Sequence, residues 1–160
     1  MKRILSVILL LIMTLTFSGC IFSTGPSATE MAKSALECFD NDDVEGLKSL
    51  FCEEVLSDVD DLDEQIEEAF AFYQGKSISK GPIGSSSEKK YREGKIVECS
   101  VEPYIADIKT DSGKEYDILV YTYTVNEAKP ERVGIYLISI YTCDENDELI
   151  LGIEIGEFLD

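Results

Sequence analysis

The sequence has 160 residues, of which 44% are hydrophobic, and it carries 14 Lys and Arg against 32 Asp and Glu. This length fits a single domain of about 100–200 residues, and the apolar content is that of a folding chain rather than of a disordered acidic tail. The net charge of −18 excludes partners that are held through their phosphates, so we expect no nucleic-acid binding. The sequence contains no His, which removes His-containing zinc sites and Ser-His-Asp catalysis.

The first 19 residues have the pattern of a bacterial secretory signal peptide. Lys2 and Arg3 precede an apolar run over 4–17, which is shorter than the about 20 residues that cross a bilayer. The run ends in Ser18-Gly19-Cys20, which resembles the lipobox of bacterial lipoproteins. In that family the Cys receives a diacylglyceryl group before cleavage, so the resemblance implies lipid attachment at Cys20. The alternatives are an ordinary signal peptide and a short N-terminal anchor helix.

Residues 20–27 follow as a short tether that contains Ser, Thr, Gly and Pro. Fully extended, it reaches at most about 25 Å. Two acyl chains hold a protein stably at a membrane, whereas anionic headgroups repel an acidic domain. We therefore expect an extracytoplasmic protein, anchored to the cell membrane through Cys20, with one folded domain over 28–160.

The first half of that domain predicts three amphipathic helices. Apolar residues recur at helical spacing over residues 28–39, 44–55 and 62–73. Asp61 and Glu64 resemble a capping box at the start of the third helix.

From residue 76 the apolar pattern changes to period two and predicts about five strands. Residues 133–141 are apolar on both alternating positions, so both faces of this strand must be covered, one by the helices and the other by a partner subunit or a loop. Helices followed by meandering strands predict an α+β fold, with three N-terminal helices on a curved antiparallel sheet. The predicted strands lie over 77–91, 95–109, 115–126, 132–143 and 148–156.

Two family resemblances accompany this pattern. Residues 31–51, MAKSALECFDNDDVEGLKSLF, resemble the opening helices of the nuclear transport factor 2-like superfamily, which has a cystatin-like cone. Residues 61–76, DLDEQIEEAFAFYQGK, and residues 129–141, KPERVGIYLISIY, resemble an uncharacterised family of Gram-positive lipoproteins, domain of unknown function 5104. The resemblances imply a cone-shaped fold over about residues 28–157 and an anchored location, but no reaction.

Aromatic residues of both halves are the candidates to line a pocket between helices and sheet. The alternative is that they only fill the core. The candidate pocket residues are Phe39, Phe51, Phe70, Tyr73, Tyr104, Tyr121 and Tyr123.

A carboxylate among phenols is the only candidate for catalysis. The superfamily includes enzymes similar to ketosteroid isomerase and scytalone dehydratase, and this resemblance implies an inward acid beside phenol donors. The candidate acid is Asp107, and the candidate phenols are Tyr104, Tyr121 and Tyr123. An acid in an apolar pocket has a raised pKa and can transfer protons near neutral pH. The alternative interpretation places Asp107 in solvent on the outer face, with Pro103 as the position of a bulge that decides between the two.

The charges and thiols point to no metal or cofactor. Residues 37–68 contain fourteen acids and one base, but residues 58–64 lack the ligand spacing of a calcium loop. Residues 76–95 contain six bases and two acids, and they form either a solvated hairpin or a complement to the acidic helices of another copy. Four cysteines allow three disulfide pairings, and buried free thiols are the favoured interpretation. These cysteines are Cys38, Cys52, Cys99 and Cys143.

The pattern favours a non-catalytic module that binds a small apolar ligand or an envelope protein. One alternative is a structural homodimer of the envelope with a filled pocket. The other is a small-molecule isomerase or dehydratase that uses a pocket carboxylate.

Overall fold

The structure is a computed structural model that describes residues 25–143 and 148–159. The predicted signal peptide, Cys20 and most of the tether lie outside the described residues. No helix in the described part of the chain is long and apolar enough to cross a membrane.

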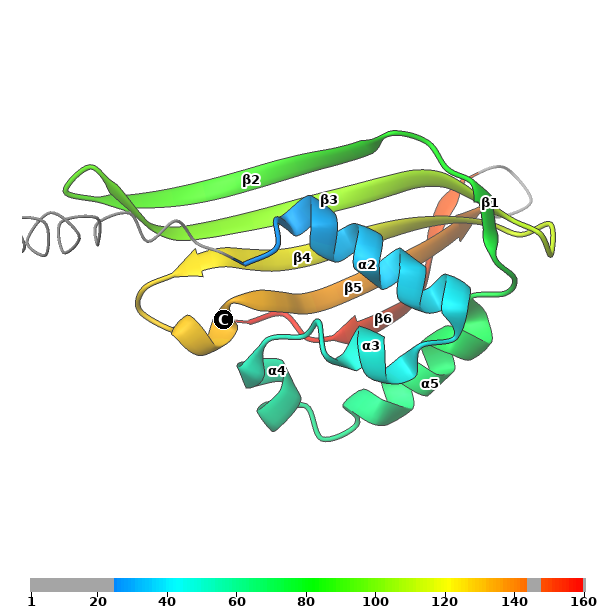
Figure 1. Ribbon diagram of the computed structural model, residues 1–160, viewed down its shortest axis with the longest axis horizontal. Coiled ribbons are helices and arrows are strands. Elements are labelled where there is room, and N and C mark those ends of the chain that lie inside the picture. Colours follow the sequence, from blue (N-terminus) through cyan, green and yellow to red (C-terminus); the bar gives the residue numbers. More distant parts are fainter. Residues whose placement is uncertain (1–24, 144–147, 160) are drawn as a thin grey trace, which may run out of the picture.

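Within these ranges the chain forms four α-helices and then a six-stranded antiparallel sheet (Figure 1). The helices are α2 (Ala28–Asn41), α3 (Val44–Lys48), α4 (Glu53–Asp58) and α5 (Leu62–Phe72). The strands are β1 (Ser77–Ser79), β2 (Ile83–Arg92), β3 (Lys95–Thr110), β4 (Glu115–Asn126), β5 (Gly134–Cys143) and β6 (Leu149–Gly156), and the short 3-10 helix η1 (Pro130–Arg132) precedes β5.

The predicted fold class is wrong. Strands hold 46% of the residues that the structure describes and the four helices are short, so the arrangement is mostly β with helices at the N-terminal end rather than three helices on a five-stranded cone. The helix predicted over 44–55 is divided because Phe51 forms a β-bridge with Ile135. The Cys52 amide donates to the Ile135 carbonyl at 2.8 Å, which fixes an extended backbone between α3 and α4.

The strand predicted over 77–91 is also divided, into β1 and β2. Pro82 lies in the break and cannot donate a backbone hydrogen bond to a ladder. Both pieces pair with β3. The strand predicted over 115–126 is confirmed, and β4 has these bounds.

The first helix starts at a capping box. The Glu30 amide donates to Ser27 Oγ at 3.3 Å, and the Ser27 amide donates to Glu30 Oε2 at 2.7 Å. The box predicted at Asp61 is wrong, since its side chain makes no capping bond.

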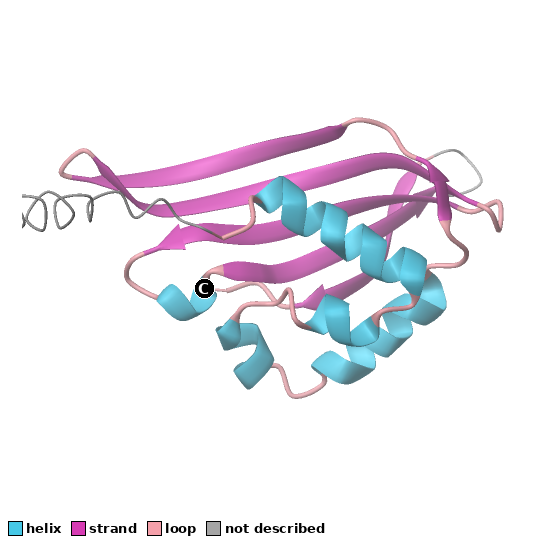
Figure 2. Ribbon diagram, in the orientation of Figure 1, coloured by secondary structure: helices cyan, strands magenta, loops and turns pink. Residues whose placement is uncertain are grey.

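All the helices lie over one face of the sheet (Figure 2). The strand order is β1-β3-β4-β5-β6, with β2 also paired to β3. Helix α2 packs on β3 and β4, and α5 packs on β6. The β2–β3 hairpin extends past the helices, and β2 is exposed along nearly its whole length (Figure 1).

Aliphatic side chains from both layers fill the core between the helices and the sheet. Burying each of them contributes about 1.5–3 kcal/mol. The fully buried members include Leu36, Leu47, Val55, Ile66, Ile105, Ile108, Ile118, Ile138 and Ile140.

Candidate functional site

The face of the sheet away from the helices carries a continuous row of side chains. Cross-strand partners lie on one face of a sheet, and Tyr104 pairs with Leu119, Leu119 with Ser139, and Ser139 with Glu154. The neighbouring pair Ile105 and Ile118 is fully buried beneath the helices, so the Tyr104 row faces the other way. We call the surface around this row the outer face.

A second row on the outer face contains Asp117, Tyr141 and Leu151, which are paired across β4, β5 and β6. The Tyr104 hydroxyl donates to Asp117 Oδ2. Burial and this hydrogen bond to the carboxylate raise the pKa of Tyr104. Tyr104 therefore stays a neutral donor. Two half-buried phenols and a carboxylate lie together on the outer face, near the ends of β4 and β5.

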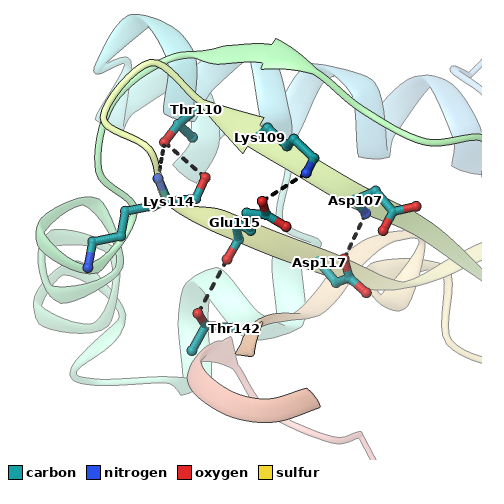
Figure 3. Close-up of polar contacts among 7 residues, drawn as sticks. All are labelled: Asp107, Lys109, Thr110, Lys114, Glu115, Asp117 and Thr142. Atoms are coloured by element: carbon teal, nitrogen blue, oxygen red, sulfur yellow. Dashed lines mark hydrogen bonds and ion pairs between the residues drawn. The ribbon is translucent and has the colours of Figure 1, made fainter. Parts of the chain in front are cut away.

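A β-bulge brings a second carboxylate to this point. The register between β3 and β4 shifts between Ile105 and Ile108, both of which are fully buried. Asp107 lies within the bulge at φ 53°, a conformation that costs about 1–3 kcal/mol for a residue other than Gly. Its side chain is exposed, while its amide donates to Asp117 Oδ1 at 2.8 Å (Figure 3).

Beside the bulge the acids line a small hollow of about 70 Å³. Glu115 Oε1 accepts from Lys109 Nζ at 2.8 Å, and the Glu115 carbonyl accepts from Thr142 Oγ1 at 3.3 Å (Figure 3). One water needs about 10–15 Å³ of such volume, so the hollow has room for the end of a single side chain, whereas pockets for small-molecule ligands measure about 300–1,000 Å³. Its lining residues are Asp107, Glu115, Tyr116, Asp117, Thr142, Cys143 and Leu149.

The structure places the candidate catalytic acid in solvent. Asp107 is exposed on the outer face, the position given by the alternative interpretation. The bulge that turns it outward lies after Ile105, and not at Pro103, which pairs in register with Ser85. Among the described residues no group of three or more Cys, Asp or Glu is arranged to hold a metal ion.

The candidate pocket residues of the helical half lie in the core. Phe39, Phe51 and Tyr73 are buried, and Phe70 is partly buried against them. The Phe39 ring lies 5.0 Å from that of Phe70 and 5.2 Å from that of Tyr73. Tyr73 also stacks on Tyr116 at 4.8 Å, so these rings fill the space between helices and sheet.

The candidates of the sheet half form a separate group. Tyr121 and Tyr123 are half-buried, and their ring centroids lie 5.9 Å and 5.2 Å from Tyr136. Phe158 covers Tyr121 at 5.3 Å. The structure therefore separates Tyr121 and Tyr123 from the aromatic residues of the helices.

Sequence reasoning missed the exposed start of β6. Leu149, Ile150 and Leu151 are 45%, 46% and 50% exposed, although they are consecutive apolar residues in a strand. Leu149 lines the hollow and Leu151 pairs with Tyr141, so this segment borders both carboxylates and phenols. The available signal was the run of three apolar residues in the last predicted strand, because a last strand that lies at the edge of a sheet has no neighbour to cover both of its faces.

Three of the described cysteines are buried and form no disulfide, in agreement with the favoured interpretation. Cys38, Cys52 and Cys99 are buried, and Cys143 is exposed. Burial raises the pKa of Cys38 and of Cys52, which lowers the fraction of reactive thiolate.

The fold and the outer face thus define an acidic domain whose helices cover one side of an antiparallel sheet and leave phenols and carboxylates on the other. The chain belongs to the family described as Domain of unknown function (DUF5104), whose model matches residues 34–144. A search of curated proteins gives no match.

Proposed function

We propose that this protein is a membrane-anchored extracytoplasmic lipoprotein whose outer face binds a cationic segment of an envelope protein. One observation carries the proposal: Tyr104, Tyr141 and Asp117 lie half-buried on a sheet face that the described helices do not cover. Tyrosine gives large contact areas at a low entropic cost and is enriched in protein interfaces.

Charge selects the partner. Asp117 and Asp107 lie side by side on the outer face, and the whole chain carries a net charge of −18. A segment that contains Lys or Arg gains from both the local carboxylates and the long-range field. An acidic segment is repelled by the same charges.

The packing of the helical half supports a protein partner over a small apolar ligand. The Phe39 ring packs against both Phe70 and Tyr73, and these rings take up the space that such a ligand needs. The hollow on the outer face admits one side chain rather than a whole small molecule.

The anchor through Cys20 is part of the proposal and depends on the lipobox alone. Mass spectrometry of the protein isolated from membranes tests the anchor. If the proposal holds, the N-terminal peptide begins at Cys20 and carries the lipid. Membership of the nuclear transport factor 2-like superfamily likewise stays a prediction.

Position-specific crosslinking in the native cell tests the binding face. A photo-crosslinking amino acid at Tyr141 on the outer face is compared with one at Glu37, which is exposed on α2. From position 141 we expect an adduct with an envelope protein, joined through a segment of that protein that contains Lys or Arg. From position 37 we expect no adduct with the same protein. Equal adducts from both positions, or none from position 141, contradict the proposal.

A further inference from the structure

The two edges of the sheet are built differently. Charged residues at Glu88, Lys89, Lys90 and Arg92 occupy the edge strand β2. Charges of this kind prevent an edge from pairing with another strand. Strand β6, at the opposite edge, has five uncharged residues over 149–153, with a bulge at Gly152 between the pairs that Leu151 and Ile153 form with β5.

The open part of the β6 edge is short and well defined. At its far end the Gly156 amide donates to Gln65 Oε1 of α5 at 2.8 Å, so α5 closes the edge there. At its near end the exposed side chains of Leu149, Ile150 and Leu151 lie beyond this cover. Such an unprotected apolar edge is the template that strand addition uses.

Carboxylates lie at both ends of the open edge. Leu149 lines the hollow together with Asp107 and Asp117, and the exposed Glu154 follows the uncharged stretch. A strand of this length therefore meets acids at each end and apolar side chains between them.

From this placement we infer that β6 accepts an extended partner segment as an additional strand, with about five apolar or neutral residues between two basic ones. The lysine near Leu149 reaches the hollow, and the other lies near Glu154. The inference rests on the proposed function and specifies how the cationic segment binds.

The β6 strand of a second copy is a poor occupant of the same edge. Antiparallel pairing of two β6 strands about Leu151 sets Glu148 of one copy opposite Glu154 of the other. Like charges directly opposite each other destabilise strand pairs. The charges therefore select a cationic strand.

Binding of a synthetic probe to the full-length protein in neutral detergent tests the inference. The probe is the heptapeptide Lys-Thr-Val-Ile-Val-Thr-Lys, and the comparison peptides carry Glu at both ends or N-methyl groups on alternate backbone amides. We expect the Kd to rise about tenfold or more for each comparison peptide, because one loses the charge match and the other the backbone hydrogen bonds.

A charge placed in the edge supplies the matched variant. Ile150→Lys is expected to weaken binding of the probe about tenfold or more, whereas Ile78→Lys, at a 70% exposed apolar residue of β1, leaves it unchanged. Circular dichroism checks that both variants fold.

Several results overturn the inference. Equal affinity for the N-methylated peptide shows binding without strand pairing, and in that case the crosslink at Tyr141 still decides the proposed function separately. Wild-type affinity in Ile150→Lys, or no measurable binding of the Lys-ended peptide, also refutes strand addition. A dimer of the protein alone that Ile150→Lys abolishes assigns the edge to a second copy instead.

Discussion

The hydrogen bond between Tyr104 and Asp117 tests whether the polar side chains of the outer face are held in a fixed arrangement. Tyr104→Phe removes the donor, and Asp117→Asn removes the charge that accepts it. A hydrogen bond to a charged group contributes about 1.5–3 kcal/mol when buried. Because both side chains are only half-buried, we expect a coupling free energy of about 1 kcal/mol, at the low end.

The assay is a double-mutant cycle by urea denaturation, followed by far-ultraviolet circular dichroism. Asp117→Asn alone should cost more than Tyr104→Phe alone, because Asp117 also accepts from the Asp107 amide at 2.8 Å. Thr124→Ala, with a threonine that donates to the Cys99 carbonyl, provides a control without coupling to Asp117. If the changes in the free energy of unfolding for Tyr104→Phe and Asp117→Asn are fully additive, Tyr104 does not hold the Asp117 carboxylate in place.

Further predictions concern the backbone, the titration of phenols and the thiols. Gly156→Ala should lower the free energy of unfolding by about 2–3 kcal/mol in denaturant titrations. Gly156 has φ +91°, and a Cβ there would lie 2.3 Å from the Tyr136 carbonyl oxygen. A Cβ at the control position, Gly84, meets no atom within 4 Å, so Gly84→Ala should not destabilise the protein. Burial raises the pKa of Tyr136 from 10.0 to about 12, so the unfolded state loses this proton first and stability should fall between pH 10 and 12; an equal fall in Tyr136→Phe would contradict this assignment. In a Cys20→Ser variant, a thiol reagent should modify Cys143 rapidly in native protein and the other cysteines only after denaturation; fast modification of four thiols would contradict the burial.

Local patterns predicted the strands better than the helices. The alternation around Ile118 and Val120 identified β4 because these residues are buried on one face and the interposed residues are not. The helix over 44–55 was predicted from apolar spacing, but Phe51 pairs with Ile135, which is 84 positions away in the sequence. A contact at that separation leaves no local signal, so a continuous helix remained the simplest prediction.

The outer face was predicted only in part. Tyr104 was a candidate, but the acid expected beside the phenols was Asp107 rather than Asp117, because strict alternation along β3 hides the bulge. The spacing of Ile105 and Ile108 carried a usable signal: two buried residues three positions apart do not fit a regular strand. Position 117 could not be selected, because the cross-strand register decides which acid Tyr104 reaches.

Chemical-shift mapping of the described domain with the Lys-ended peptide tests the account most directly, because it separates the outer face from general attraction to negative charge. Most acids of the helical half lie over residues 37–68, so unspecific attraction would perturb α4 and α5. The account predicts the largest shifts over residues 149–153 of β6 and at Tyr141, which pairs with Leu151, with the helices unchanged. Shifts confined to α4 and α5 would contradict it.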